Sequence, residues 1–249
     1  MSYTQPLNLR RRAVFALYGP GAALLLLGLA LGKRDDKAIN RIPLQVRMAS
    51  SALVLACALL LWRGEDRPER LAGYVAVGMG CGFLGDLIMA EVIPLPEHVL
   101  FGMLTFGVGH GWYMRALLDR ARADARRSTQ LRQLAARARW TALGTAWVVA
   151  LVGWWALVRN PKIGPALNYG ALVYALLLSS MSGLAAALAA QDRRYLPVAF
   201  GGALFLASDM LLASRLFRAT HFPQIGDVVW MTYIAGQALI VGGMGLAED

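Results

Sequence analysis

Long apolar segments, separated by short stretches that hold most of the charged residues, most strongly constrain how this chain folds. A helix needs about 20 mostly apolar residues to cross the roughly 30 Å hydrocarbon core of a bilayer. Eight segments of the 249-residue chain come close: residues 13–31, 48–62, 71–92, 98–118, 140–158, 166–190, 196–213 and 226–246. The sequence therefore predicts an all-α integral membrane protein, with a bundle of about eight transmembrane helices forming a single domain over residues 1–249.

The composition excludes the soluble, collagenous and disordered classes. Hydrophobic residues make up 57% of the chain and charged residues 16%. In a soluble domain, about 45–50% of the residues are apolar and about 25% are charged. A net charge of +10 would suggest nucleic acid as the partner of a soluble protein. Here the cations lie between apolar segments, where they set topology and contact anionic lipids. We expect membrane lipid, and not nucleic acid, to be the partner.

The distribution of Lys and Arg predicts the orientation of the bundle. With eight spans, 16 of these residues lie on the side of the N-terminus and 9 on the other side. Because cytoplasmic loops carry the excess of Lys and Arg, we expect both termini in the cytoplasm and the protein in the cell (inner) membrane. The Arg-rich segment 119–139 is then a cytoplasmic link. It is interpreted as a solvated topology signal, or alternatively as a helix on the anionic inner leaflet.

A short internal similarity joins two of the predicted spans. Residues 83–90 (FLGDLIMA) resemble residues 205–213 (FLASDMLLA), with one residue inserted before the acid. Because the two spans run in the same direction, a four-plus-four parallel repeat is one interpretation. Chance similarity between segments rich in Leu and Ala is the other.

Two acids within the apolar segments are the strongest candidates for function. Asp86 and Asp209 each cost about 2.5–3.5 kcal/mol near the centre of a membrane helix. Counted along their helices, both lie roughly 20 Å from the inner face, so they can share one cavity. A structural acid, satisfied by an Arg or by hydroxyl groups, is the alternative. Because two acids lie at the same depth, we favour a functional role for them over a structural one.

Other polar side chains fall on the same spans. His110 and Tyr113 form an i, i+3 pair, and Tyr233 and Gln237 form an i, i+4 pair. His110 is interpreted equally as a structural residue and as part of the site. Asn168 adds a further polar contact. We expect these residues to contact the substrate.

The sequence predicts neither a metal nor a cofactor. A catalytic zinc ion needs three protein ligands, but the chain has three His in total, and none of them forms an HxxxH or HExxH pattern. A glycine-rich phosphate loop and a GxSxG nucleophile motif are also absent from the sequence.

An ordered set of short motifs resembles the YhhN-type lysoplasmalogenase family. The motifs are Gly82-Phe83-Leu84-Gly85-Asp86, Phe101-Gly102-Met103 through Phe106 to His110 and Tyr113, residues 201–209 (GGALFLASD), and Tyr233 to Gln237. The resemblance implies an eight-helix bundle that hydrolyses 1-alkenyl lysoglycerophospholipids of choline or ethanolamine to a fatty aldehyde and the glycerophospho-head group. It also implies that Asp86 and Asp209 are catalytic, and Ser208 adjoins the second acid as a substrate contact.

One departure from the family concerns the phosphate. The family commonly has Lys-Pro at the start of the second span, whereas this chain has Arg47-Met48. Because arginine holds a phosphate group bidentately, we expect Arg47 to contact the head group. Arg215 and Arg218 are further candidates on the same side of the membrane, with a role in topology or lipid anchoring as the alternative.

The chemistry that the resemblance implies suits a pair of carboxyl groups. A vinyl ether hydrolyses when an acid protonates its β-carbon, leaving an oxocarbenium ion that water attacks. One carboxyl would donate the proton and the other would activate water, in either assignment. The alternatives are a membrane carrier or channel that uses the acids as proton or cation sites, and another intramembrane lipid hydrolase.

Overall fold

The structure is a computed structural model that describes residues 5–35, 38–63, 70–125, 129–160 and 162–246. These residues form eight α-helices, and each predicted span coincides with one helix. The helices are α1 (Gln5–Leu31), α2 (Leu44–Arg63), α3 (Arg70–Met89), α4 (His98–Ala125), α5 (Thr129–Gly153), α6 (Pro165–Ala189), α7 (Leu196–Arg218) and α8 (Ile225–Leu246). A π-helical turn, Trp154–Val158, extends α5, and a 3₁₀ turn, Arg193–Tyr195, precedes α7.

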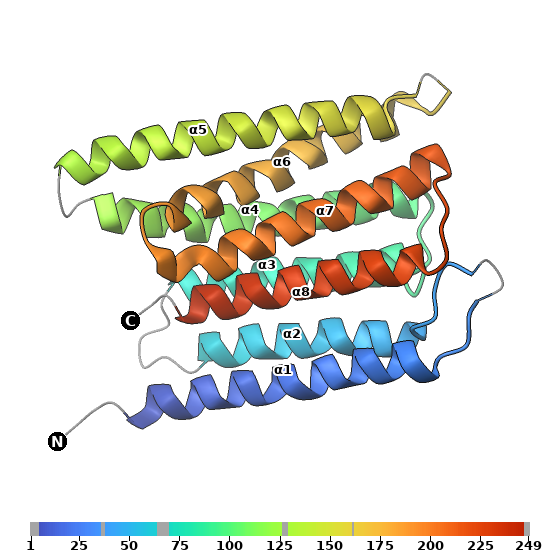
Figure 1. The fold of residues 1–249 in the computed structure, drawn as a ribbon, viewed down its shortest axis with the longest axis horizontal. Coiled ribbons are helices and arrows are strands. Elements are labelled where there is room, and N and C mark those ends of the chain that lie inside the picture. Colours follow the sequence, from blue (N-terminus) through green and yellow to red (C-terminus); the bar gives the residue numbers. More distant parts are fainter. Residues whose placement is uncertain (1–4, 36–37, 64–69, 126–128, 161, 247–249) are drawn as a thin grey trace.

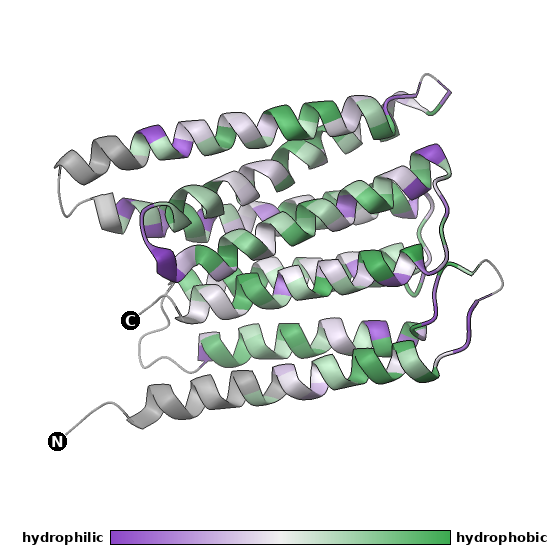
Figure 2. Ribbon diagram, in the orientation of Figure 1, coloured by the Kyte–Doolittle hydropathy of each residue, from purple (hydrophilic) through white to green (hydrophobic). Residues whose placement is uncertain are grey.

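Six helices are long and apolar enough to cross a membrane: α2, α3, α5 with its π-helical turn, α6, α7 and α8. In the described part of α1 the apolar stretch is shorter, Tyr18–Leu31. The chain is therefore a multi-pass membrane protein, and membrane crossing by α1 and α4 stays a prediction. The outer face of α5 exposes apolar side chains, including Val148, Val152 and Trp155, as expected of a surface that faces lipid (Figure 2).

The helices lie side by side with alternating direction, and the start of α1 and the end of α8 lie at the same end of the bundle (Figure 1). Sequential helices pack in pairs, while α8 also contacts α1, α2 and α3, and α4 contacts α6. Because the start of α1 and the end of α8 lie at the same end, the described chain runs along the bundle an even number of times. Which membrane face holds the chain ends, and whether the halves are a repeat, stay predictions.

Glycines let two of the helix pairs approach closely. A Cβ on Gly201 of α7 would lie 2.7 Å from the carbonyl oxygen of Gly236 in α8, and a Cβ on Gly236 would lie 2.8 Å from that of Gly201. A Cβ on Gly109 of α4 would lie 2.9 Å from the carbonyl oxygen of Gly78 in α3. Small residues at such crossings let membrane helices pack backbone to backbone. α8 is thereby drawn against α7, in the centre of the bundle.

The Arg-rich segment 119–139 differs from the expected link. α4 continues to Ala125 and α5 begins at Thr129, so most of this segment extends two long helices, and residues 126–128 lie outside the described part. Within the extension, Asp119 accepts from Arg115 at 3.3 Å and from Arg122 at 2.9 Å. These i, i+4 and i, i+3 pairs stabilise a solvated helix.

The loop between α1 and α2 covers the opposite end of the bundle and is fastened to the start of α8. The buried carboxylate of Asp227 accepts from the backbone N–H groups of Arg41 at 2.6 Å and Ile42 at 3.0 Å. Nearby, the backbone N–H of Gly226 donates to the carbonyl of Ile39 at 2.9 Å. These bonds hold the loop over the region where the two candidate acids lie.

Candidate functional site

Asp86 of α3 and Asp209 of α7 line one cavity of about 120 Å³, here called the polar cavity. Its wall comes from α2, α3, α4, α7, α8 and the α1–α2 loop. The lining residues are Asn40, Arg47, Met48, Asp86, Met89, Ala90, Phe106, Phe205, Ser208, Asp209, Leu212, Arg215, Gly226, Val229, Trp230 and Tyr233. The structure thus brings together two acids that are separated by almost half of the sequence.

Asp86 is held by hydroxyl groups from two other helices. Its side chain is 4% exposed, and its Oδ2 accepts from Ser51 Oγ of α2 at 2.5 Å and from the Tyr233 hydroxyl of α8 at 3.0 Å. Hydrogen bonds to a carboxylate are shorter and stronger than those between neutral groups. The position of the carboxyl is therefore fixed from two sides.

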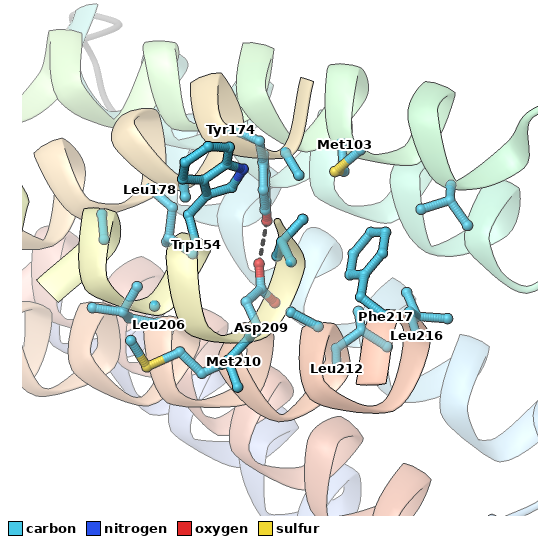
Figure 3. A pocket seen from close by; sticks show the side chains of 18 of the residues that line it. Met103, Trp154, Tyr174, Leu178, Leu206, Asp209, Met210, Leu212, Leu216 and Phe217 are labelled. Carbon is cyan, nitrogen blue, oxygen red and sulfur yellow. Dashed lines mark hydrogen bonds between the residues drawn. The ribbon is translucent and has the colours of Figure 1, made fainter. Parts of the chain in front are cut away.

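Asp209 has a matching set of donors. The hydroxyl of Tyr174 in α6 donates to its Oδ2 (Figure 3), and Ser208 Oγ donates to its Oδ1 at 3.3 Å. Each acid thus has one tyrosine and one serine donor, and within the described residues neither acid forms an ion pair. Hydroxyl groups satisfy both acids in part, as the structural alternative expects. A purely structural acid, however, has no need of a cavity.

A chain of hydrogen bonds supports Asp86 from behind. The Tyr113 hydroxyl of α4 donates to Gln237 Oε1 at 2.8 Å, Gln237 Nε2 donates to the Tyr233 hydroxyl at 3.2 Å, and Tyr233 donates to Asp86. Gly82 leaves room for this chain, because a Cβ there would lie 2.8 Å from Gln237 Nε2. Of the three supporting side chains, Tyr233 lines the polar cavity; Tyr113 and Gln237 lie behind it.

Two predicted site residues lie elsewhere. His110 is 1% exposed, and its ring centroid lies 4.8 Å from that of Phe205 and 5.7 Å from that of Tyr174. Neither of its ring nitrogens has a hydrogen-bond partner in the described part of the chain. The amide of Asn168 binds the backbone of Asn160 and Ile163 and so fastens the α5–α6 loop. Neither residue lines the polar cavity.

Arg47 and Arg215 both line the polar cavity. Arg47 comes from the first turn of α2, and its guanidinium lies 5.9 Å from the ring centroid of Trp230. The Nε atoms of both arginines are buried and have no partner among the described residues. Arg218 instead donates to the backbone carbonyls of Ala156 and Arg159 and lies outside the cavity.

A second, almost wholly apolar pocket of about 90 Å³ also has Asp209 in its wall; Figure 3 shows this pocket. Its wall comes from α3, α4, α5, the π-helical turn, α6 and α7. Met89, Asp209 and Leu212 line both this apolar pocket and the polar cavity. Asp209 therefore stands at the junction of a polar and an apolar space. No three His, Cys, Asp or Glu side chains are grouped to hold a metal ion in the described ranges.

Sequence reasoning missed Ser51, Trp230 and the donor role of Tyr174. Ser51 did carry a signal, since Ser50 and Ser51 interrupt an otherwise apolar segment. Ser50 lies outside the polar cavity but is bonded to two of its lining residues: it accepts from Trp230 Nε1 at 3.1 Å and donates to the carbonyl of Arg47 at 2.6 Å.

The comparison with protein families gives one match. The model of the YhhN family matches residues 45–244, a range that includes both acids, both cavity arginines and every hydroxyl donor described above. No curated protein and no solved structure matches the chain.

Proposed function

The chain belongs to the YhhN family, which includes lysoplasmalogenases, and from this premise we propose that it hydrolyses the vinyl-ether bond of 1-alkenyl lysoglycerophospholipids. One observation carries the proposal. Two carboxyl groups from separate helices line the same cavity, each held by hydroxyl donors and neither in an ion pair with a described residue. The substrates are choline or ethanolamine lysolipids, and the products are a fatty aldehyde and the glycerophospho-head group.

Asp86 and Asp209 divide the acid and base roles between them. Two neighbouring carboxylates repel each other in a cavity of low dielectric constant, so the pair is best accommodated when it shares one proton. The protonated carboxyl gives this proton to the β-carbon of the vinyl ether, and the ionised carboxylate stabilises the oxocarbenium ion. The carboxylate then takes a proton from the attacking water. The resulting hemiacetal then breaks its bond to the glycerol oxygen: the carboxyl protonated by water gives its proton to that oxygen, and the other carboxylate takes the hydroxyl proton. Aldehyde and alcohol are released, and the pair again holds one proton.

The substrate range tests this chemistry directly. Purified protein is given 1-alkenyl, 1-alkyl and 1-acyl lysophospholipids with matched chains, and the released aldehyde is measured. We expect aldehyde from the alkenyl lipid alone, because a saturated ether has no π-bond to protonate. Turnover of the acyl lipid at the rate of the alkenyl lipid would contradict the mechanism.

An isotope measurement tests the protonation step. In D₂O the proton shared by the acids is deuterium, so rapidly trapped aldehyde should carry one deuterium on the carbon next to the carbonyl group. Aldehyde without this deuterium would exclude protonation of the β-carbon.

Two further measurements separate the rival functions. A proton carrier that used the same acids would move protons across liposomes and release no aldehyde, whereas we expect aldehyde and no proton flux. Activity should survive exhaustive treatment with EDTA and dipicolinate. Loss on chelation with recovery on added zinc would indicate a metallohydrolase.

A further inference from the structure

The two arginines of the polar cavity form no direct ion pair with a described carboxylate; Asp35 and Asp227 attract Arg47, and Asp35 attracts Arg215, only at longer range. Ion pairs in the described part of the chain join Asp119 to Arg115 and Arg122, and Asp192 to Arg194. Arg47 and Arg215 form none of them, although both are partly buried and line the same wall as two acids. Removing a charge from water without a partner is costly. Two such guanidinium groups in one cavity therefore indicate that the site receives an anion.

The charge of the cavity fits one phosphodiester. Among the residues that line the cavity, two arginines and an acid pair that shares one proton sum to a single positive charge. A lysophospholipid phosphate carries one negative charge, and guanidinium groups bind phosphate oxygens through paired hydrogen bonds. Arg47 and Arg215 come from α2 and α7, so they approach such a group from two helices.

The order of polarity through the two spaces matches that of a single-chain phospholipid. The arginines and acids line the polar cavity, and Asp209 also lines the apolar pocket. A lysophospholipid has its phosphate at one end, then the glycerol and the bond to the chain, and then the hydrocarbon.

We propose that the polar cavity and the apolar pocket are the two halves of one lysophospholipid site. Arg47 and Arg215 bind the phosphate, the apolar pocket takes the part of the chain next to the ether bond, and Asp209 lies where the two parts meet. This assignment deepens the proposed function and rests on it for the position of the cleaved bond.

Another apolar cavity provides a control. It has a volume of about 630 Å³, lies between α1, α2, α8 and the start of α7, and shares no lining residue with the polar cavity among the residues described. Ala235 lines this larger cavity, whereas Ala213 lines the apolar pocket beside Asp209. Replacing either alanine with leucine adds the same side-chain volume to a different space.

The experiment measures binding in place of hydrolysis. Purified protein in detergent binds a radiolabelled 1-alkyl lysophosphatidylcholine, which has the phosphate and the chain but no vinyl bond. The competitors are the same unlabelled lipid, a 1-alkylglycerol without the phosphate, and glycerophosphocholine without the chain. The variants are Arg47→Gln, Arg215→Gln, Ala213→Leu and Ala235→Leu. Arg34→Gln, at an exposed arginine of the α1–α2 loop, controls for the loss of a charge.

The two kinds of variant should affect different ligands. Each cavity-arginine variant should bind the labelled lipid about ten- to a hundredfold more weakly, as expected for the loss of a hydrogen-bonded charge. The same variants should bind the alkylglycerol unchanged, which also shows that they are folded. Ala213→Leu should weaken both chain-bearing ligands by about fourfold for each displaced methylene and leave glycerophosphocholine unaffected. Arg34→Gln and Ala235→Leu should match the wild type.

Failure of this assignment is distinct from failure of the proposed function. If Arg47→Gln or Arg215→Gln binds the labelled lipid like the wild type, or weakens the alkylglycerol equally, the phosphate assignment is wrong whatever the enzyme hydrolyses. An effect of Ala235→Leu in place of Ala213→Leu would move the chain to the larger cavity and overturn the assignment of the apolar pocket. If the ligands bind as expected but no aldehyde forms from alkenyl lipid, the proposed reaction fails while the binding site stands.

Discussion

At the scale of single residues, the two acids have equivalent donors from different elements. Tyr233 and Ser51 hold Asp86 from α8 and α2, and Tyr174 and Ser208 hold Asp209 from α6 and from its own helix. Donors of this kind orient a carboxyl without neutralising it, in contrast to an arginine or lysine partner. This arrangement suits the proton exchange with a substrate that we propose for the two acids.

The first prediction concerns the acids themselves. Asp86→Asn and Asp209→Asn should each lower kcat by about 10²–10⁴-fold, because an amide cannot act as a general acid or base. Aldehyde release measures the effect, and the melting temperature shows that the variant is folded. Asp192→Asn, at a partly exposed acid before α7, should remain fully active. A loss smaller than tenfold at either cavity acid would remove it from the catalytic pair.

The second prediction concerns the tyrosine donors. Tyr174→Phe and Tyr233→Phe should each lower kcat by roughly tenfold, since a hydrogen bond to a charged group contributes about 1.5–3 kcal/mol. Tyr169→Phe is the matched control, because Tyr169 lies on α6 with Tyr174 but is exposed. If Tyr174→Phe were as active as Tyr169→Phe, orientation of Asp209 by this hydroxyl would have no part in the reaction.

The sequence predicted the acids but not most of their partners, for a physical reason. A carboxyl group in an apolar segment is costly enough to stand out, whereas a serine or tyrosine in a membrane helix is common and inexpensive. Whether Ser51 or Tyr174 faces an acid depends on how the helices rotate and which of them are neighbours. The central place of α8 decides this for Tyr233, and no local pattern contains that information.

At the scale of the elements, the ends and crossings of the helices determine the shape of the site. α3 was expected to continue to residue 92 but ends at Met89, because Glu91 takes a left-handed backbone conformation with φ of 56°. Asp86 thus lies one turn from the end of its helix. Asp209 lies nine residues before the end of α7, which continues to Arg218.

The third prediction tests the glycine face of α3. Gly82→Ala should lower kcat by about tenfold, because the new Cβ would lie 2.8 Å from Gln237 Nε2 and displace the hydrogen-bond chain that ends at Asp86. Gly80→Ala is the control on the same helix, because its nearest neighbour would lie 3.9 Å away. The activities and melting temperatures of both variants are compared. Equal activity would show that the chain does not position the acid.

The fourth prediction tests the fastening of the α1–α2 loop. Asp227→Ala should lower the free energy of unfolding by about 2–4 kcal/mol, because two backbone N–H groups lose a charged acceptor. Asp227→Asn keeps one acceptor oxygen and should cost less. Chemical denaturation in detergent measures both changes. Because both variants lack the charge, the reverse order would mean that the hydrogen bonds to this side chain do not stabilise the loop.

At the scale of the whole molecule, the chain ends and the polar cavity lie at opposite ends of the bundle. The loops that cover the cavity follow α1 and α3 and precede α8, whereas the start of α1 and the end of α8 lie at the far end (Figure 1). The eight apolar segments predicted this alternation, because each occupies one helix. The extension of α4 and α5 beyond the apolar residues was not predicted, since hydropathy does not register a solvated helix.

The fifth prediction concerns the orientation in the membrane. A green fluorescent protein fused after Asp249 should fluoresce, and alkaline phosphatase fused there should be inactive, because the excess of Lys and Arg places this end in the cytoplasm. Fusions made after His221, in the loop between α7 and α8, should behave in the opposite way. Active phosphatase at the C-terminus would invert the topology.

Because Asp209 lies between a polar and an apolar space, the proposed enzyme would hold its substrate at a fixed position relative to the acids. If the phosphate is anchored by two arginines, the cleaved bond is selected by its distance from the phosphate and not from the end of the hydrocarbon. Selection by this distance tolerates hydrocarbon chains of different length, because their far ends extend beyond the pocket. The same distance discriminates between glycerol positions. An alkenyl chain moved from the first to the second glycerol carbon would place its ether oxygen too near the phosphate to meet the acids.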